Sequence, residues 1–403
     1  MGEKQVTAKS AREASALLVV SICFLIAGLE GYDIQAFGVA APKLVPQLGL
    51  DASQQGWAAS AAMVGLVLGA FSGGWIADRV GRKPVLVGSV LIFGIGSLWT
   101  ALSHDYGTLL LARVATGVGL GGALPNLIAI AQEISPPARR GATTSTMFCG
   151  MPAGGAIVAL AAKMAGEGLD WRVIFMIGGA LPLLVAPLVL ILLPETRPAR
   201  DETADRRLLK ALFGGGRAIP TLLLWTANLL TLVVLYLTLN WLPTLVVAKG
   251  HTVGDGAEAS LAFNLVGVVG ALVVGFLVDR VGYRWALAAT YAALALCMFA
   301  LAGVGPMGLI LTLSAVAGFL VLGANYVLYS LAPRLYAPQV RAAGAGAAVG
   351  IGRFGSIIGP LFAGELRHAG WSAGQVLGAM LPVVLAAGAA VFALTFLAKT
   401  DID

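Results

Sequence analysis

Two carboxylates lie close together inside the first apolar stretch of the chain. They belong to Glu30-Gly31-Tyr32-Asp33, and their spacing of three residues would place them on one face of a helix. If this stretch spans a membrane, each buried charge costs about 2.5 to 3.5 kcal/mol on insertion scales, so a functional reason is expected. Burial and mutual repulsion favour the protonated form of at least one carboxylate, which suits proton exchange near neutral pH. The alternative is a salt bridge to Arg113 or Arg353 that only holds helices together.

Arg353 is enclosed by small and apolar residues in Gly350-Ile-Gly352-Arg353-Phe-Gly355. A guanidinium is permanently charged and can bind a carboxylate through two parallel hydrogen bonds. We therefore expect Arg353, assisted by Arg113, to receive the carboxylate of an anionic ligand. The competing interpretation makes Arg353 the counter-ion of Asp33 or Glu30.

Several aromatic and amide side chains could complete such a site. A tyrosine offers a ring face and a hydroxyl to an aromatic ligand, although most aromatic residues in membrane proteins only pack or lie at the interfaces. The candidates near the middle of apolar stretches are Tyr32, Tyr236, Tyr326 and Tyr329, with Asn240 as a further hydrogen-bonding group.

The chain is a duplication. Gly74-Trp-Ile-Ala-Asp78-Arg79-Val-Gly81-Arg82-Lys83 returns in degraded form as Gly275-Phe-Leu-Val-Asp279-Arg280-Val-Gly282-Tyr-Arg284, at an offset of 201 residues in a chain of 403. The same offset aligns Arg140 with Arg341, so the two halves are similar. Residues shared by both halves are expected to be scaffold. The four buried charges fail to repeat, because Glu30, Asp33, Arg113 and Arg353 align with Thr231, Val234, Ser314 and Pro152.

Composition points to the membrane. The chain has 58% hydrophobic and only 11% charged residues, with a mean hydropathy of +0.88, whereas soluble proteins carry about 25% charged residues. The net charge of +6 falls in short clusters between apolar runs, which excludes a nucleic-acid-binding surface. We expect no metal site, cofactor or enzyme activity, because the three cysteines lie inside apolar runs and the three histidines show no metal-ligand spacing.

Apolar runs of about 20 residues predict an all-α membrane protein with twelve transmembrane helices in two pseudo-symmetric six-helix bundles. The predicted domains are an N-terminal bundle at 1–193, a cytoplasmic linker at 194–217 and a C-terminal bundle at 218–403. The predicted spans are 15–40, 55–77, 84–103, 107–132, 141–163, 171–193, 218–247, 257–278, 284–303, 306–333, 341–364 and 372–398.

The distribution of Lys and Arg predicts the orientation, because these residues favour cytoplasmic loops. Of the 26 basic residues, two lie within spans, and 19 would be cytoplasmic if the N-terminus is inside. The five that would then lie outside are Lys43, Lys163, Arg172, Lys249 and Arg367. Both termini and the linker are therefore expected in the cytoplasm.

The repeated stretch resembles the signature loop between helices 2 and 3 of the major facilitator superfamily, with its weaker counterpart between helices 8 and 9. Arg113-Val-Ala-Thr-Gly117-Val-Gly119-Leu-Gly121 is similar to the helix 4 motif of proton-coupled members, a resemblance that links Arg113 to proton coupling. Near the cytoplasmic helix ends we expect a structural charge cluster that stabilises one conformation. Its members are Asp78, Arg79, Arg82, Glu133, Arg140, Asp279, Arg280 and Arg341.

A narrower resemblance is to the aromatic acid:proton symporter family. It is carried by Glu30-Gly-Tyr-Asp33 with Gln35-Ala36, by Gly119 to Ile128, by Asn240-Trp241-Leu-Pro243 and by Arg341 to Gly355. Glu30 replaces the more common Asp, and with Gln35 and Cys149-Gly150-Met-Pro152 this looks most like the branch of 3-(3-hydroxyphenyl)propionate transporters.

The resemblance implies uptake of a small aromatic carboxylic acid with protons across a bacterial inner membrane, by rocking of two halves around a midplane site. We expect a monomer in the lipid bilayer, with protons as the coupling ion and Asp33 as the carrier tuned by Glu30. One alternative is a proton-coupled exporter, because Gly150-Met-Pro152-Ala-Gly154-Gly155 resembles a helix 5 motif of drug antiporters. A sensor is a weaker alternative, because the polar linker is too short for an output domain.

The orientation gives a first prediction. A cysteine introduced as Thr203→Cys in the linker should resist impermeant thiol reagents in intact cells, whereas Gly254→Cys in an outer loop should be labelled. Labelling at position 203 together with protection at position 254 would reverse the orientation.

Overall fold

The computed structural model of the chain describes residues 2–134, 143, 146–168, 170–193, 195, 212–214, 216–336 and 340–397. Within these residues the regular secondary structure is entirely helical, which confirms the all-α prediction. Most of the predicted linker at 194–217, and Arg140 of the predicted charge cluster, lie outside the described residues.

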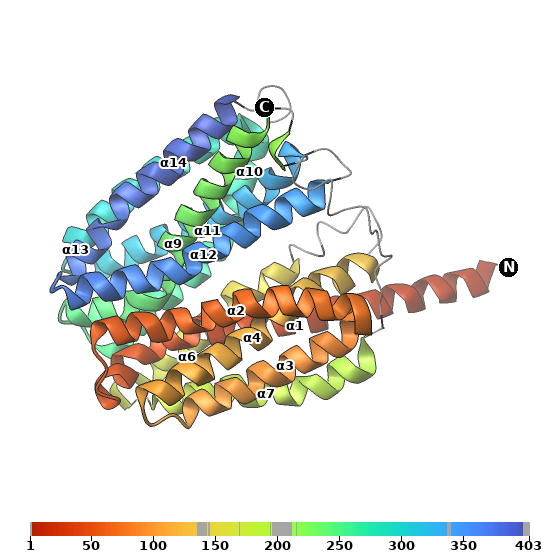
Figure 1. Ribbon diagram of the computed structural model, residues 1–403, viewed down its shortest axis with the longest axis horizontal. Coiled ribbons are helices and arrows are strands. Elements are labelled where there is room, and N and C mark those ends of the chain that lie inside the picture. Colours follow the sequence, from red (N-terminus) through yellow and green to blue (C-terminus); the bar gives the residue numbers. More distant parts are fainter. Residues whose placement is uncertain are drawn as a thin grey trace. The chain divides into compact units, whose positions relative to one another are not determined.

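The described part of the first half forms six labelled α-helices (Figure 1). They are α1 (Gly2–Gln47), α2 (Ala52–Val80), α3 (Arg82–Ala101), α4 (Tyr106–Ile134), α6 (Gly150–Ala165) and α7 (Trp171–Leu192), with a 3-10 turn at Gly166–Gly168. Helix α1 begins well before the predicted span at 15–40 and ends after it, and its apolar part is Leu18–Gln47.

The second half repeats the pattern with one long helix. Its elements are α9 (Ala218–Ala248), α10 (Val253–Gly303), α11 (Met307–Leu331), the 3-10 turn Ala332–Leu335, α12 (Arg341–His368), α13 (Ala373–Gly378) and α14 (Met380–Leu397). Helices α13 and α14 together form one apolar segment, Ala373–Leu397.

Eleven helical segments of the described chain are long and apolar enough to cross a membrane. One of them, α10, has 51 residues and would measure about 75 Å at 1.5 Å per residue, more than twice the hydrocarbon thickness. Its backbone leaves the helical region at Gly282, between the predicted spans 257–278 and 284–303. Helix α10 is therefore long enough for two crossings, and the described residues then provide the predicted twelve.

The break between paired helices occurs at the same repeat position in both halves. Gly81 has φ 102° and ψ 161° between α2 and α3, and Gly282 has φ 81° and ψ 161° inside α10. This backbone region is essentially restricted to glycine. The duplicated stretch thus turns the chain through one glycine in each half.

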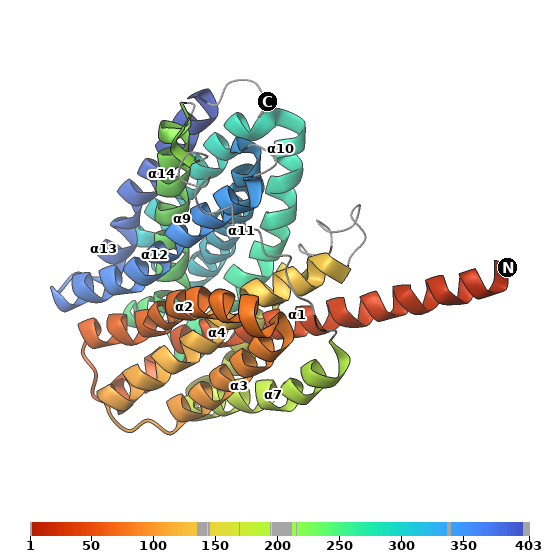
Figure 2. The same ribbon diagram turned by 45° about the vertical axis from the view of Figure 1, so that its right-hand side comes forward.

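The chain divides into two compact units. Unit 1 comprises Met1–Ala36, Val64–Val158 and Asp170–Arg200, and unit 2 comprises Phe37–Met63, Ala159–Leu169 and Asp201–Asp403. In unit 1, α3 packs against α4 and α7, and Figure 2 shows these neighbours from a second side. In unit 2, α9 packs against α12 and α14, and α10 packs against α11.

Unit 2 includes the end of α1 and the start of α2, which pack closely on its other helices. A Cβ atom at Gly38 would lie 2.9 Å from the Cα of Asn240 on α9, and one at Gly56 would lie 3.1 Å from the Cα of Gly364 on α12. Glycine permits this approach, and close packing replaces the hydrophobic effect as the force between helices in lipid.

The paired glycines give a second prediction. Gly81→Ala and Gly282→Ala should each destabilise the protein by about 1 to 3 kcal/mol, because alanine is strained in their backbone conformation. Thermal unfolding of the purified protein in detergent micelles should show a lower midpoint for both variants.

Matched controls exist at Gly74 and Gly275, which occupy equivalent positions inside α2 and α10. A Cβ atom added at either glycine would have nothing within 4 Å. Gly74→Ala and Gly275→Ala should keep or raise the midpoint, because alanine favours a helix. Equal losses at all four positions would contradict the role assigned to the backbone conformation.

Candidate functional site

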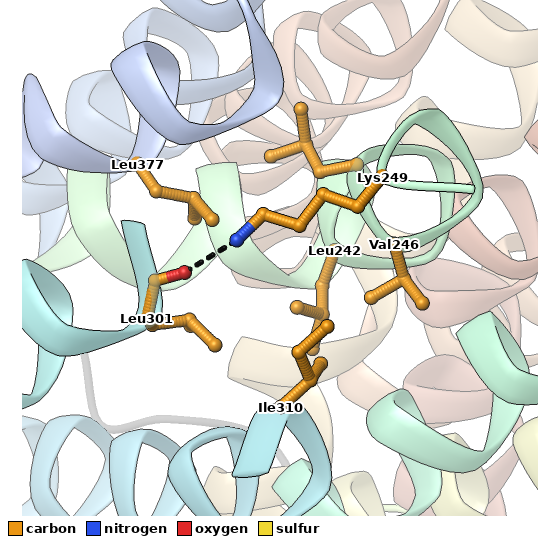
Figure 3. Close-up of a pocket in the computed structure, with 7 residues that line it drawn as sticks. Leu242, Val246, Lys249, Leu301, Ile310 and Leu377 are labelled. Atoms are coloured by element: carbon orange, nitrogen blue, oxygen red, sulfur yellow. Dashed lines mark hydrogen bonds between the residues drawn. The ribbon is translucent and has the colours of Figure 1, made fainter. Parts of the chain in front are cut away.

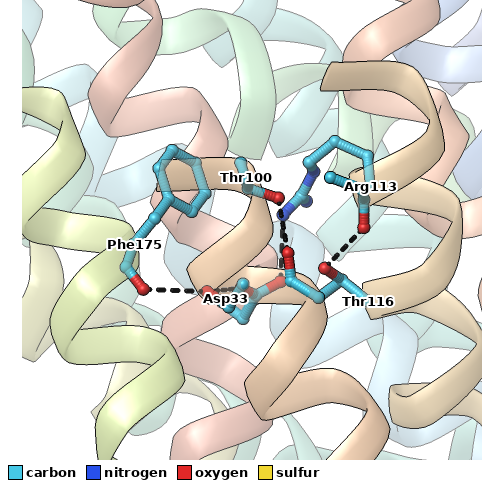
Figure 4. Close-up of polar contacts among 8 residues, drawn as sticks. Asp33, Thr100, Arg113, Thr116 and Phe175 are labelled. Carbon is cyan, nitrogen blue, oxygen red and sulfur yellow. Dashed lines mark hydrogen bonds and ion pairs between the residues drawn. The ribbon is translucent and has the colours of Figure 1, made fainter. Parts of the chain in front are cut away.

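Unit 1 contains a buried ion pair between α1 and α4. Arg113 Nη1 lies 3.1 Å from Asp33 Oδ2, and both side chains are at most 1% exposed (Figure 4). A buried charge left without a partner is strongly destabilising, whereas a paired and hydrogen-bonded one is tolerated. The structure therefore brings together two of the three residues predicted to couple protons.

Helices α3 and α7 complete the surroundings of this ion pair. Ser97 Oγ on α3 donates a hydrogen bond to Asp33 Oδ1 at 3.0 Å, and it also lies 3.2 Å from the carbonyl oxygen of Phe175 on α7. The guanidinium carbon of Arg113 lies 5.6 Å from the centre of the Phe175 ring, within the range of a cation–π contact. Each oxygen of the Asp33 carboxylate thus has a donor.

Small residues allow the helices to approach closely enough for these contacts. A Cβ atom at Gly96 would lie 2.6 Å from the backbone nitrogen of Thr116 on α4, which brings α3 against α4 beside Ser97. Gly178 on α7 leaves room for the Tyr32 ring and for Ser97 Oγ, which would lie 3.1 and 3.2 Å from a Cβ atom there. The close approach of these helix backbones therefore brings the side chains of the site together.

Glu30 and Tyr32 precede Asp33 on α1. Glu30 is 1% exposed, so both carboxylates of the predicted pair are buried. The Tyr32 hydroxyl donates to the carbonyl oxygen of Ile174 at 3.1 Å, which ties α1 to α7. This contact gives Tyr32 a packing role within unit 1, and its contact with a ligand stays a prediction.

In unit 2 the structure joins Arg353 and Tyr236, two of the predicted ligand-binding residues. Arg353 Nη1 on α12 donates to the hydroxyl oxygen of Tyr236 on α9 at 2.9 Å. Gly352 lies against Asn228 of α9, whose Cβ would be 3.2 Å from a Cβ at the glycine, so the backbones of α9 and α12 run close together here. Tyr236 is buried and Arg353 is half-buried, so a hydroxyl from the protein interior helps to position the guanidinium.

The other predicted ligand-binding residues of unit 2 lie near this pair in sequence or pack among themselves. Asn240 is buried and its side-chain nitrogen donates to the carbonyl oxygen of Tyr236 at 2.9 Å. Tyr326 and Tyr329 on α11 are half-buried and make an edge-to-face contact with ring centres 6.3 Å apart. Their participation in binding stays a prediction, as does that of Arg113.

Two arginines of the predicted charge cluster lie over aromatic rings. The guanidinium of Arg79 lies 3.3 Å from the ring centre of Trp75, and that of Arg280 lies 4.5 Å from the ring centre of Phe276 at the equivalent position. The backbone N–H of Arg82 donates to Glu195 Oε1 at 3.0 Å. Asp78, Asp279 and Arg341 are exposed. The side chain of Glu133 lies outside the described residues, so the cluster's conformational role stays a prediction.

A small apolar pocket in unit 2 carries one cation, Lys249, at the end of α9. Its ammonium donates to the carbonyl oxygens of Leu301, Ala302 and Val304 at 2.7, 3.2 and 2.8 Å, and Figure 3 shows the first of these bonds. Burial lowers the pKa of Lys249. Because three carbonyls already occupy its donors, Lys249 caps the end of α10.

Ser97 was missed by inspection of the sequence, although the comparison of the two halves contains its signal. Its counterpart at the 201-residue offset is Met298, so its hydroxyl, like the four buried charges, occurs in one half only. Phe175 gave no such signal, because its contribution comes from a backbone carbonyl and a ring face.

The chain matches the family model of the Major Facilitator Superfamily over residues 23–360. It is 41% identical to the 3-(3-hydroxy-phenyl)propionate transporter of Escherichia coli (strain K12), over 96% of this chain and 95% of that protein. It is 35% identical to the 4-hydroxybenzoate transporter PcaK of Pseudomonas putida, over 91% of this chain and 90% of that protein.

Solved structures share the fold at low sequence identity. A bacterial homolog of the human lysosomal transporter Spinster, in an inward-facing and unoccupied conformation, superposes with a TM-score of 0.79 at 18% identity, covering 96% of this chain and 98% of that one. A D-xylose-proton symporter superposes with a TM-score of 0.73 at 18% identity, covering the same shares. The family match and the two transporters above show that the protein is a transporter rather than an enzyme. It belongs to the major facilitator superfamily and, within it, to the group that contains these aromatic acid transporters.

Proposed function

We propose that the protein imports an aromatic carboxylic acid, such as a hydroxyphenylpropionate or a hydroxybenzoate, together with protons by alternating access. The observation that carries this proposal is the buried ion pair of Asp33 and Arg113. An ionised carboxylate at this depth is maintained by its partners, and a proton that binds to it removes the charge that holds Arg113. Proton binding can therefore change the contacts between α1 and α4.

The substrate class is supported by the relatives and by the chemistry of unit 2. The relatives are named as transporters of 3-(3-hydroxyphenyl)propionate and 4-hydroxybenzoate, both aromatic acids. Arg353 is half-buried and is oriented by the hydroxyl of Tyr236, and a guanidinium in such a place suits an incoming carboxylate. We assign the carboxylate of the substrate to Arg353, with Arg113 assisting.

Proton symport lowers the charge that must cross the membrane core. An aromatic carboxylate that moves with one proton adds no net charge to the transported complex, so the low-dielectric barrier to reorientation is smaller. We further propose a monomer in a bacterial inner membrane, with both termini in the cytoplasm and protons as the coupling ion. We propose that transport needs no bound cofactor.

Uptake into proteoliposomes tests this function and gives the third prediction. With an imposed pH gradient, acid outside, the wild-type protein should accumulate hydroxyphenylpropionate and hydroxybenzoate, and the neutral amide of the same ring should be transported poorly. Asp33→Asn should lose gradient-driven accumulation, because a carboxamide does not take up a proton at these pH values, while exchange of labelled for unlabelled substrate can continue.

Two controls are needed. Protein-free liposomes give the background, because neutral aromatic acids cross bilayers unaided, and a protonophore should abolish accumulation by the wild type. Accumulation that survives in Asp33→Asn would remove Asp33 as the proton carrier. Extrusion of the acid that is driven by an inward proton gradient would favour the exporter instead.

The assignment of Arg353 gives the fourth prediction. Arg353→Ala should weaken binding of the acid by roughly 10- to 150-fold, which corresponds to about 1.5 to 3 kcal/mol for a hydrogen bond to a charged group. Arg353→Lys should restore only part of the affinity if the contact is bidentate. Equilibrium binding of the labelled acid to purified protein measures both effects.

Arg367 provides a matched control on the same helix. It lies in the last turn of α12 and donates to the carbonyl oxygen of Trp371 at 2.7 Å. Arg367→Ala should bind the acid like the wild type. Wild-type affinity in Arg353→Ala would remove Arg353 from the site and leave Arg113 as the carboxylate ligand.

A further inference from the structure

Ser97 Oγ lies between two acceptors that belong to different helices. It is 3.0 Å from the Asp33 Oδ1 on α1 and 3.2 Å from the Phe175 carbonyl oxygen on α7. A serine hydroxyl has one proton to donate, so it can make a full hydrogen bond to only one of these acceptors at a time.

Burial makes the choice between the two acceptors depend on charge. Ser97, Asp33 and Phe175 are all 0% exposed, so bulk water does not compete for the hydroxyl. An ionised carboxylate is a much stronger acceptor than a backbone carbonyl, and hydrogen bonds with one charged member are roughly twice as strong. A protonated carboxyl group loses this advantage and can itself donate to Ser97 Oγ.

We infer that Ser97 is a positioning residue of the proton site, which donates to Asp33 when the carboxylate is ionised and to the Phe175 carbonyl when it is protonated. The proton of the hydroxyl stays on Ser97, and only its acceptor changes. Protonation of Asp33 thereby moves a hydrogen bond from the α1–α3 contact to the α3–α7 contact. This inference rests on the proposed role of Asp33 as proton carrier.

The charged groups near Asp33 do not take the place of the Ser97 hydroxyl at Oδ1. Arg113 is the cation in contact with Asp33, and it is bound to the other carboxylate oxygen, Oδ2. Glu30 lies one turn away on α1, and Tyr32 uses its hydroxyl on Ile174. Apart from Arg113, the charged residues of the other described helices of the first half lie near helix ends: Asp78 and Arg79 on α2, Arg82 and Lys83 on α3, Glu133 on α4, Lys163 on α6 and Arg172 on α7.

The geometry of α7 also suits a hydrogen bond from Ser97 Oγ to the Phe175 carbonyl oxygen. The carbonyl oxygens of Ile174 and Phe175 are adjacent on α7, and the first already accepts a hydrogen bond from Tyr32 on α1. Gly178, one turn later, keeps the space beside Ser97 Oγ open, because a Cβ atom there would lie 3.2 Å from it. The hydroxyl can therefore rotate between its two acceptors without moving a helix.

The fifth prediction concerns Ser97→Ala in the full-length protein. The ionised carboxylate loses a donor, so the pH at which gradient-driven uptake of hydroxyphenylpropionate is half-maximal should shift upward by about one to two units, the size expected for a hydrogen bond to a charged group. Substrate exchange without a gradient should continue, since the ion pair with Arg113 remains. Ser97→Thr, which keeps a hydroxyl, should return the midpoint toward that of the wild type.

A spectroscopic measurement on purified protein supports the kinetic one. The C=O stretching band of a protonated carboxyl group, assigned to Asp33 by its absence in Asp33→Asn, should titrate with the same upward shift in Ser97→Ala. Ser103 is the matched control, since it is buried just beyond α3 and its hydroxyl donates to the carbonyl oxygen of Trp99 at 3.1 Å. Ser103→Ala should leave both midpoints unchanged.

Different outcomes would overturn the symport and the role of Ser97. Wild-type uptake that ignores the pH gradient would overturn the proposed symport, whatever Ser97→Ala does. Gradient-driven wild-type uptake with unchanged midpoints in Ser97→Ala would overturn the role of Ser97 alone. An equal shift in Ser103→Ala would mean that the midpoint reports general packing of α3, and would also overturn it.

Discussion

The ion pair of Asp33 and Arg113 constrains every helix around it. Transfer of each charge from water to the interior costs several kcal/mol, and removal of one member of a buried pair typically costs about 3 to 5 kcal/mol. The pair is tolerated because Ser97 binds the second carboxylate oxygen and the Phe175 ring lies near the guanidinium. Helices α1, α3, α4 and α7 must therefore meet at one level, and a change in charge there affects all four.

The duplicated scaffold explains how this asymmetric site can be built on a symmetric frame. Gly81 and Gly282 make the same backbone turn in the two halves, and the stacks of Arg79 on Trp75 and of Arg280 on Phe276 repeat around them. The buried ion pair lies at positions where the halves differ. Asp33 and Arg113 align with Val234 and Ser314, so the second half has no equivalent ion pair at these positions.

Much of the architecture could be predicted because lipid imposes simple rules. A span needs about 20 apolar residues. Each buried charge needs a partner, so Arg113 could be predicted as one of two candidate partners of Asp33. The contact of Arg353 with Tyr236 joins residues that were predicted for one site, although the hydrogen bond itself has no signature in the sequence. Ser97 was missed because serine is tolerated in membrane helices for packing alone. The extent of α1 beyond 15–40 was also missed, because hydropathy reports the membrane segment rather than the helix.

Helix α1 connects the two chemical sites along the chain. Asp33 lies four residues before Phe37, where α1 passes from unit 1 into unit 2. Within unit 2, Gly38 packs against the backbone of Asn240 on α9, one turn after Tyr236, whose hydroxyl accepts from Arg353. Helix α1 is therefore one continuous helix that carries the proposed proton carrier Asp33 and also packs on α9, whose Tyr236 contacts Arg353.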